Sequence, residues 1–137
     1  MRDEIERILT ETRTVAVVGM SPRSDRPSHY VAKYLMEQGY HIIPVNPIVD
    51  EVAGLKSYPD LRSIPRNVDL VDIFRRSSQV PPIVDEAIEI GSKFIWMQDG
   101  VIHEDAAAKA RAAGLSVVMD NCTLREHSRR YGGSRRD

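Results

Sequence analysis

Short, continuous hydrophobic runs alternate along this chain with longer segments in which hydrophobic residues recur every three or four positions. The continuous runs are typical of strands buried on both faces of a parallel sheet, and the periodic segments are typical of amphipathic helices. The runs predict strands at residues 14–18, 40–45, 69–74, 94–97 and 115–119. Residues 56–58 are predicted to form a further short strand at an edge, the third of six in chain order.

Five helices are predicted around these strands. They cover residues 3–12, 27–39, about 81–91 and 104–114, and a short segment from residue 123. Proline suits the first turn of a helix and glycine commonly follows the last turn, so Pro27 and Gly39 mark the two ends of one helix. The side chains of that helix expected to face the sheet are Tyr30, Val31, Tyr34 and Leu35.

The C-terminal region carries two further signals. Thr123 and Glu126 have the three-residue spacing of a capping box, which predicts a last short helix. Residues 132–137 are predicted to form a flexible tail, in which Arg135 and Arg136 are solvated charges. Residues 1–131 are predicted to form a single domain, because a chain of 137 residues is long enough for one hydrophobic core.

Strands that alternate with helices predict an α/β fold with a doubly wound, mainly parallel sheet and helices on both faces. With right-handed connections, the order 3-2-1-4-5-6 of a Rossmann-like fold is the natural arrangement. Ligands of such sheets bind outside the carboxyl ends of the strands, where the strand order reverses. That switch point lies here between the strands at residues 14–18 and 69–74.

Two loops meet at the predicted switch point, residues 19–26 and 74–78. Gly19 allows a sharp turn and a close approach of a ligand, and Pro27 with Ser28 opens the following helix. A loop with exposed amides before a helix N-terminus is a ready site for an anion. Both loops carry arginines: Arg23, Arg26, Arg75 and Arg76. We therefore predict a phosphate-bearing ligand; the alternative is an ordinary loop with solvated cations.

Composition and charge narrow the class of protein. The hydrophobic content of 42% is normal for a globular protein, and the formal net charge of -1 argues against a protein that coats nucleic acid. Neither a membrane-spanning run nor a signal peptide is evident, so no membrane association is expected. The single cysteine, Cys122, allows no internal disulfide, which fits a cytoplasmic location.

The loop sequences also narrow the choice of nucleotide-like ligand. The NAD fingerprint G-x-G-x-x-G is absent, and the second strand ends at Asn46-Pro47 rather than at an acidic residue that would hold ribose hydroxyls. No P-loop sequence is present either. Coenzyme A fits a phosphate-rich, adenine-bearing ligand, because its pyrophosphate and ribose phosphate suit several arginines.

Motifs along most of the chain resemble those of the small stand-alone CoA-binding protein family. They are VVGMSPRSDRPSHYVAKYLMEQGYHIIPVNP, GLKSYPDL, DLVDIFRRSSQVPPIVDEAIEIG, WMQDGV and VVMDNC, in this order from about residue 14 to residue 127. The resemblance implies a Rossmann-like fold similar to the CoA-binding domain of the succinyl-CoA synthetase α subunit, and usually no assigned reaction. In the synthetase, a histidine that is phosphorylated during turnover lies in a second domain.

The resemblance also implies which residues bind coenzyme A. Gly19, Ser21 and Arg26, beside Arg23 and Pro27, would lie at the phosphates. Asn46 and Pro47 would border the adenosine. The opposite wall would be formed by Phe74, Arg75, Arg76 and Val80. Gln98 and Gly100 would lie nearer the pantetheine arm, whereas Asp99 is left out of the predicted site.

The histidines and the cysteine are the candidates for catalysis. His41 and His103 are interpreted as structural, and we consider Cys122 with His127 as a candidate activated nucleophile. Five residues apart, they are a weak signal, and no metal site is predicted. The prediction is therefore a carrier, sensor or regulatory module that binds CoA or acyl-CoA without catalysis of its own. The alternative is an enzyme that acts on an acyl-CoA thioester or another nucleotide-linked substrate.

Cys122 is also predicted to form a mixed disulfide with coenzyme A under oxidising conditions. It follows the sixth strand at the edge of the sheet where the ligand is expected, and Arg125 and His127 would favour its thiolate form. Two arguments oppose this prediction: the sixth strand is two strands from the switch point, and a free cysteine is often buried and inert.

Overall fold

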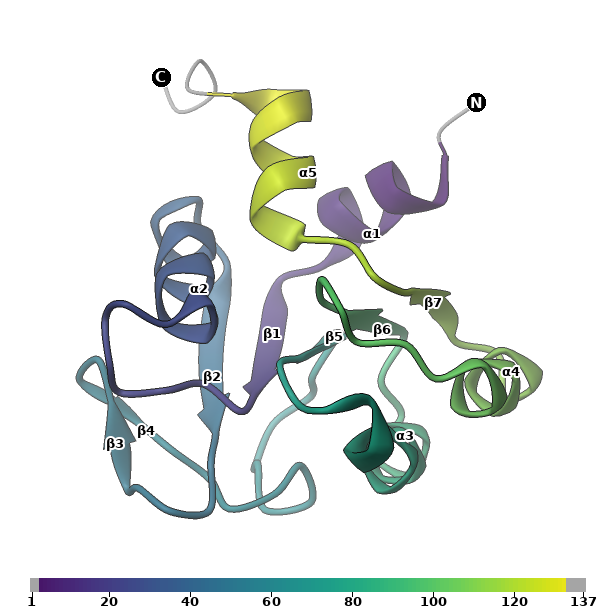
Figure 1. Ribbon diagram of the computed structural model, residues 1–137, viewed down its shortest axis with the longest axis horizontal. Helices are drawn as coiled ribbons and strands as arrows, with labels where there is room; N and C mark the ends of the chain where they lie inside the picture. The colour runs from purple at the N-terminus through teal and green to yellow at the C-terminus, as the bar shows by residue number, and fades with distance from the viewer. Residues whose placement is uncertain (1–2, 133–137) are drawn as a thin grey trace.

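The fold is a five-stranded parallel sheet with helices on both faces, as seen in a computed structural model that describes residues 3–132 (Figure 1). The order of the strands is β2-β1-β5-β6-β7. Their bounds are β1 Thr14–Val18, β2 His41–Val45, β5 Leu70–Ile73, β6 Phe94–Met97 and β7 Ser116–Val118. The predicted α/β, Rossmann-like class and the relative order of these five strands are thus confirmed.

The third predicted strand, at residues 56–58, is reduced to a single parallel bridge between Val45 and Tyr58. Lys56 instead belongs to β4 (Leu55–Lys56), which pairs antiparallel with β3 (Glu51–Val52) in a separate small hairpin. Pairing with β2 consists of hydrogen bonds on either side of the bridge: Tyr58 N–H donates to the Pro44 carbonyl, and Asn46 N–H donates to the Tyr58 carbonyl. The predicted short edge strand does not extend further, because Pro59 follows Tyr58 directly and has no N–H with which to extend the ladder.

Helices cover the two faces of the sheet in separate groups (Figure 1). On one face lie α1 (Glu4–Glu11), α2 (Pro27–Glu37) and α5 (Thr123–Tyr131). On the other lie α3 (Val80–Glu89), which follows a 3-10 turn at Ser77–Gln79, and α4 (Glu104–Ala112). The strands are buried on both faces, as the continuous hydrophobic runs predict, because each face contributes to its own core.

Two local predictions on the helices are wrong. Tyr30, expected to face the sheet, is 49% exposed, because the face of α2 that packs on the sheet runs through Val31 and Leu35. The capping box also fails to form: Cys122 is the N-cap of α5, and the Thr123 side chain is buried among polar groups below the helix. Glu126 accepts hydrogen bonds from arginine and asparagine side chains instead.

Two further findings concern the lengths of the helices and the C-terminal end of the chain. Among residues 3–132, every helix is too short or too polar to cross a membrane. Of the predicted tail, residues 132–137, only Gly132 lies within the described residues, where it follows the last turn of α5.

Candidate functional site

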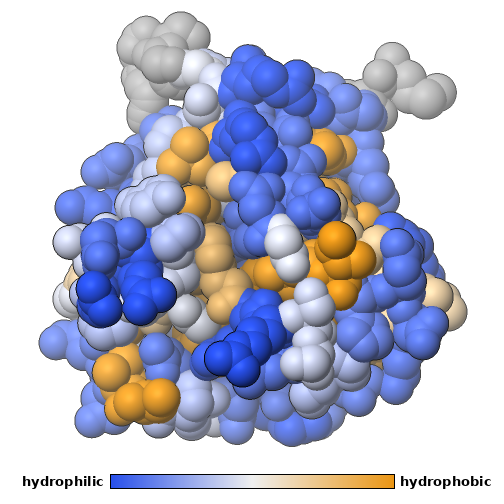
Figure 2. Space-filling view, viewed as in Figure 1, coloured by the Kyte–Doolittle hydropathy of each residue, from blue (hydrophilic) through white to orange (hydrophobic). Residues whose placement is uncertain are grey.

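A pocket of about 840 Å³ lies at the carboxyl ends of β1, β5 and β6, beside the N-termini of α2 and α5. The loops that border it converge near the centre of the view in Figure 1, and Figure 2 shows hydrophobic surface gathered near the middle of this face with hydrophilic surface around it. Its volume is typical of a small-molecule site. The lining residues are Gly19, Ser21, Arg26, Pro27, Ser28, Tyr30, Val31, Phe74, Arg75, Arg76, Gln79, Gln98, Asp99, Gly100, Val101, Cys122, Leu124 and Arg125.

Gly19 brings the loop after β1 into contact with the loop after β5. Its φ is +90°, a conformation that other residues adopt only with strain. A Cβ built on it would lie 2.5 Å from the Phe74 carbonyl oxygen and 3.2 Å from Nε of Arg75. Only a glycine therefore fits at the point where the two pocket loops meet.

The walls of the pocket carry three arginines that lack a protein partner. The side chains of Arg26, Arg75 and Arg76 form no hydrogen bond or ion pair with any residue in the described range 3–132. By contrast, the exposed Arg23 guanidinium lies 3.2 Å from the Asp25 carboxylate. Three uncompensated guanidinium groups around one pocket create a positive potential that favours an anionic ligand.

Nine of the thirteen predicted site residues line this pocket. They are Gly19, Ser21, Arg26, Pro27, Phe74, Arg75, Arg76, Gln98 and Gly100. Their meeting follows from the parallel sheet, which brings the carboxyl ends of β1, β5 and β6 to one edge.

The other four predicted residues do not line the pocket, and each has a structural reason. Arg23 lies further out in its loop, where it pairs with an aspartate. Asn46 uses its side chain to hold loops: Nδ2 donates to the Met20 carbonyl at 3.0 Å, and Oδ1 accepts from Ile48 N–H at 2.9 Å. Pro47 follows it in an exposed turn. Val80 is fully buried in the core, because it begins the stripe of α3 that packs on the sheet.

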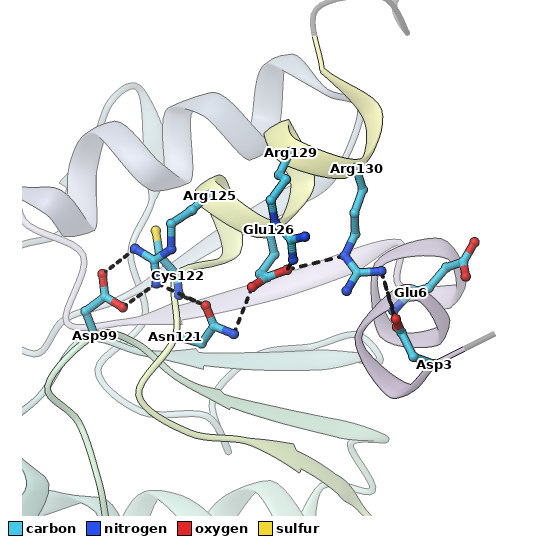
Figure 3. A network of polar contacts seen from close by, with 9 residues as sticks. All are labelled: Asp3, Glu6, Asp99, Asn121, Cys122, Arg125, Glu126, Arg129 and Arg130. Carbon is cyan, nitrogen blue, oxygen red and sulfur yellow. Dashed lines mark hydrogen bonds and ion pairs between the residues drawn. The ribbon is translucent and has the colours of Figure 1, made fainter.

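Sequence reasoning missed most of the wall formed by the start of α5. Cys122, Leu124 and Arg125 reach the pocket because β7 ends beside β6, so the chain that leaves it returns across the sheet. Arg125 forms two hydrogen bonds, of 2.7 and 2.9 Å, with the Asp99 carboxylate in the loop after β6 (Figure 3). These bonds hold the pKa of Asp99 below its ordinary value. The omitted Asp99 is therefore part of the pocket wall, held there by a contact that spacing does not reveal.

Polar contacts fasten α5 over this edge of the sheet. Asn121 Nδ2 donates to Glu126 at 3.1 Å, and Arg130 bridges Glu126 to Asp3 at the start of α1 (Figure 3). These contacts connect α5, which follows the Cys122 wall of the pocket, to the N-terminal end of the described chain.

Gln98 forms part of the pocket wall and belongs to a buried polar cluster beneath it. Its Nε2 donates to Asp72 Oδ1 at 2.6 Å and to Thr123 Oγ1 at 2.9 Å. Asp72, on the central strand β5, is completely buried. Burial raises the pKa of Asp72 to about 7, against the opposing effect of the hydrogen bonds from Gln98 and Thr123.

Cys122 and His127, the candidate catalytic pair, lie in different surroundings. His127 is buried and hydrogen-bonds the Tyr34 hydroxyl at 2.8 Å, with tyrosine rings around it. Cys122 lines the pocket, so the distance from the switch point does not separate it from a ligand there. Its mixed disulfide stays a prediction. Within residues 3–132, no group of three or more histidine, cysteine, aspartate or glutamate residues is arranged to hold a metal ion.

The two histidines interpreted as structural have local roles. His103 is the N-cap of α4, and its Nδ1 accepts from Ala106 N–H at 3.1 Å. His41 lies at the exposed start of β2, where its ring contacts Arg66. Neither lines the pocket.

Comparisons with known sequences match the chain to a protein family and to individual proteins. Residues 13–128 match the family described as "CoA binding domain". The chain is 41% identical over 125 residues to YneT, an uncharacterized protein of Bacillus subtilis (strain 168), across 91% of this chain and 93% of YneT. It is 28% identical over 120 residues to acetate–CoA ligase [ADP-forming] I of Archaeoglobus fulgidus, across 80% of this chain but only 18% of that ligase.

Solved structures agree with these matches. A redesigned form of the protein PH1109 superposes with a TM-score of 0.94 at 39% identity, covering 98% of this chain and 94% of that one. A hypothetical protein from Pyrococcus horikoshii OT3 gives a TM-score of 0.90 at 40% identity, covering 92% and 89%. A dinucleotide-forming acetyl-coenzyme A synthetase of Ca. Korarchaeum cryptofilum gives 0.75 at 26% identity, covering 86% of this chain and 27% of the synthetase.

Proposed function

The chain belongs to the CoA-binding domain family, and from that premise we propose that its pocket binds coenzyme A or an acyl-CoA. The observation that carries the proposal is the set of three unpaired arginines around the pocket: Arg26, Arg75 and Arg76. Uncompensated guanidinium groups favour a ligand with several phosphates, because charge-assisted hydrogen bonds to phosphate are among the stronger polar contacts.

The pocket offers different chemistry at its two ends, and the proposed ligand has the same asymmetry. At the loops after β1 and β5, the arginines and the close-packed backbone at Gly19 suit the pyrophosphate and the ribose phosphate. At the loop after β6 and the start of α5, the hydrophobic side chains of Val101 and Leu124 accompany the polar Gln98. That end suits the pantetheine arm, which alternates amides with methylene groups.

We assign the protein a role as carrier, sensor or regulatory module rather than a catalyst. None of the described residues that line the pocket is a histidine, and Asp99, a carboxylate on its wall, is neutralised by an arginine. The ligase of Archaeoglobus fulgidus is more than five times as long as the segment that matches this chain, so its activity does not transfer to a chain that spans 18% of it. We also propose a cytoplasmic location.

The proposal predicts that coenzyme A raises the melting temperature of the protein. A ligand that binds only the folded state stabilises it by RT ln(1 + [L]/Kd), which is about 2.7 kcal/mol at a hundredfold excess over Kd. NAD and NADP at the same concentrations should shift the melting temperature much less. Thermal unfolding followed by fluorescence or calorimetry measures the shifts, and a larger shift with NAD than with coenzyme A would overturn the proposal.

A second function, hydrolysis of an acyl-CoA thioester, is favoured by one observation. Cys122, at the N-cap of α5, lines the same pocket and carries a thiol that could attack a bound thioester. Purified protein incubated with acetyl-CoA, with Cys122→Ala as the control, separates the two functions. Release of free thiol that disappears in the variant supports the enzyme, and no release above the control supports the binding module.

A further inference from the structure

The carboxylate of Asp72 lies in the middle of the central sheet, and none of the cationic side chains in residues 3–132 forms an ion pair with it. The described residues that hydrogen-bond Asp72 are Gln98 and Thr123, both neutral and both buried. Burying an uncompensated carboxylate opposes folding, so a neutral side chain of similar size would make a more stable core. The position of Asp72 directly below a pocket residue indicates what the carboxylate does there.

Asp72 fixes the direction of every hydrogen bond in this cluster. An ionised carboxylate only accepts, so it takes one hydrogen from Gln98 Nε2 at 2.6 Å and the hydroxyl hydrogen of Thr123 at 3.4 Å. The Thr123 oxygen, having given its hydrogen, accepts the second hydrogen of Nε2 at 2.9 Å. Both hydrogens of the Gln98 amide are therefore used below the pocket.

The amide oxygen of Gln98 is left without a partner. Gln98 is 4% exposed, it lines the pocket, and its Oε1 accepts no hydrogen bond from the described residues 3–132. Because the amide is planar, holding Nε2 between Asp72 and Thr123 also fixes where Oε1 lies. A reversed amide would place this oxygen against the Asp72 carboxylate, where two acceptors would face each other.

We propose that Asp72 is a positioning residue, which holds the Gln98 amide so that Oε1 acts as a hydrogen-bond acceptor in the pocket. The site then selects a ligand with a hydrogen-bond donor next to Gln98 Oε1. Resting on the proposed function, this inference identifies the donor as an N–H group of the pantetheine arm, since the adenosine and phosphate parts are assigned to the arginine end. Gln98 Oε1 has no hydrogen-bond partner among the described residues and is not fully enclosed, so a ligand N–H in the pocket that bonds it is favoured over an analogue without one.

Protonation of Asp72 would remove this selection. A neutral carboxyl group can donate to Gln98 Oε1, which allows the amide to turn and present its NH₂ group to the pocket. A ligand N–H therefore binds better to the form in which Asp72 is ionised, and its binding tightens as Asp72 loses its proton.

Among residues 3–132, no other titratable side chain hydrogen-bonds Asp72, Gln98 or Thr123. On α1, α2 and α5, the helices of the same face, the titratable side chains have other surroundings or partners. Among them are His29, whose Nδ1 donates to the Ser21 carbonyl, Tyr34 and His127, which bond each other, and Glu126, which is held by arginines. The titratable and charged residues that line the same pocket as Gln98 are Tyr30, Cys122, Arg26, Arg75, Arg76, Asp99 and Arg125, and the last two pair with each other. A pH effect at Gln98 is thus expected to come from Asp72.

The test compares two ligands at several pH values. One is coenzyme A, and the other is the β-methyl ester of adenosine 3′-phosphate 5′-diphosphate, in which a methyl group replaces the pantetheine arm, so the phosphate groups are esterified as in coenzyme A. Dissociation constants are measured by calorimetry from pH 5.5 to pH 8.5 for wild type, Asp72→Asn and Gln98→Met. Because both ligands share their phosphate titration, the ratio of the two constants isolates the arm.

In wild type, we expect the preference for coenzyme A over the fragment to grow about three- to tenfold as the pH rises through 7, the scale of one hydrogen bond. In Asp72→Asn, the preference should be smaller and independent of pH. Gln98→Met should lose the same preference while its affinity for the fragment stays within about twofold of wild type.

Equal weakening of both ligands by either variant would overturn the inference, because it would reveal damage to the whole pocket. A preference in wild type that does not change with pH would overturn it as well, and that measurement needs no variant to fold. If wild type binds the fragment but shows no preference for coenzyme A, the inference fails while a phosphate site remains. If wild type binds neither ligand, the proposed function itself fails and the inference with it.

Discussion

Arginine side chains of this protein differ in whether a carboxylate lies beside them. Arg62, Arg125 and Arg130 each form ion pairs that join separate elements of the fold. Three arginines of the pocket, Arg26, Arg75 and Arg76, have no such partner among residues 3–132. An unpaired, exposed guanidinium contributes little to folding, so its removal tests ligand binding with little effect on the fold.

Replacing Arg26 or Arg76 with alanine should weaken coenzyme A binding by roughly 1–3 kcal/mol each, the usual scale of a charge-assisted hydrogen bond. With dephospho-CoA, the effect should shrink for whichever arginine contacts the ribose phosphate. Calorimetric titration gives both values. Arg23→Ala is the matched control, since Arg23 lies in the same loop but outside the pocket, paired with Asp25. Unchanged titration curves for both pocket variants would identify their arginines as solvated loop cations.

At the scale of elements, the connection from β1 to α2 determines the shape of the pocket. Gly19 N–H donates to the Val45 carbonyl of β2 at 2.8 Å, and Phe74 N–H donates to the Val18 carbonyl at 2.9 Å, so the three strand ends are joined. Ser28 Oγ then accepts from Ser21 N–H at 2.9 Å, which folds the loop back onto the first turn of α2. The loop is therefore held from both sides before any ligand binds.

Gly19→Ala should destabilise the protein more than an ordinary glycine substitution and should abolish tight coenzyme A binding. A side chain at φ +90° is strained, and its Cβ would lie 2.5 Å from the Phe74 oxygen, so the loops after β1 and β5 must separate. Gly91→Ala is the matched control: its φ is +77°, but nothing lies within 4 Å of its Cβ.

Urea unfolding of both variants, with coenzyme A titration, measures the difference. The control should lose about 1–2 kcal/mol of stability from backbone strain alone and keep its affinity for coenzyme A. Equal losses of stability in the two variants would contradict the close approach at Gly19.

At the scale of the whole molecule, the two cores differ in what they enclose. The core under α3 and α4 is formed by hydrophobic side chains such as those of Ile95, Met97 and Ala107. The face under α1, α2 and α5 encloses Trp96 and Phe94 but also Asp72, Gln98 and Thr123. A buried carboxylate with a raised pKa makes the stability of the whole fold depend on pH.

Asp72 should reduce stability progressively as the pH rises from about 4 to about 7. Its pKa in the folded protein is raised from 3.8 to about 7, mainly by burial, so in this window the folded state binds more protons than the unfolded state. The free energy of unfolding therefore falls as the pH rises, by a few kcal/mol in total, and levels off above pH 7. Asp72→Asn lacks this contribution, because asparagine does not titrate.

Urea unfolding of wild type and Asp72→Asn at pH 4.5, 6 and 8 measures the effect as a difference, which cancels the titration of all other groups. Wild type should lose stability relative to the variant with rising pH. A difference that stays constant across the three pH values would show that Asp72 has the same protonation state in the folded and unfolded chains.

The sequence by itself determined the elements and the central edge of the site. Continuous runs such as Val15 to Val18, alternating with helical segments, are typical of a parallel sheet, and that sheet brings Gly19, Phe74 and Gln98 to one edge. These are consequences of short-range patterns and of one topological rule, so they can be derived without coordinates.

Only the tertiary structure decided which neighbours share the pocket. The direction of α5 across the sheet, set by contacts such as Arg130 with Asp3 over 127 residues of sequence, brought Cys122 and Arg125 to the wall. The same packing turned Thr123 from a helix cap into a partner of Asp72, and it buried Val80 in the core. Such pairings depend on distances between elements that are far apart in sequence, and no local periodicity encodes them.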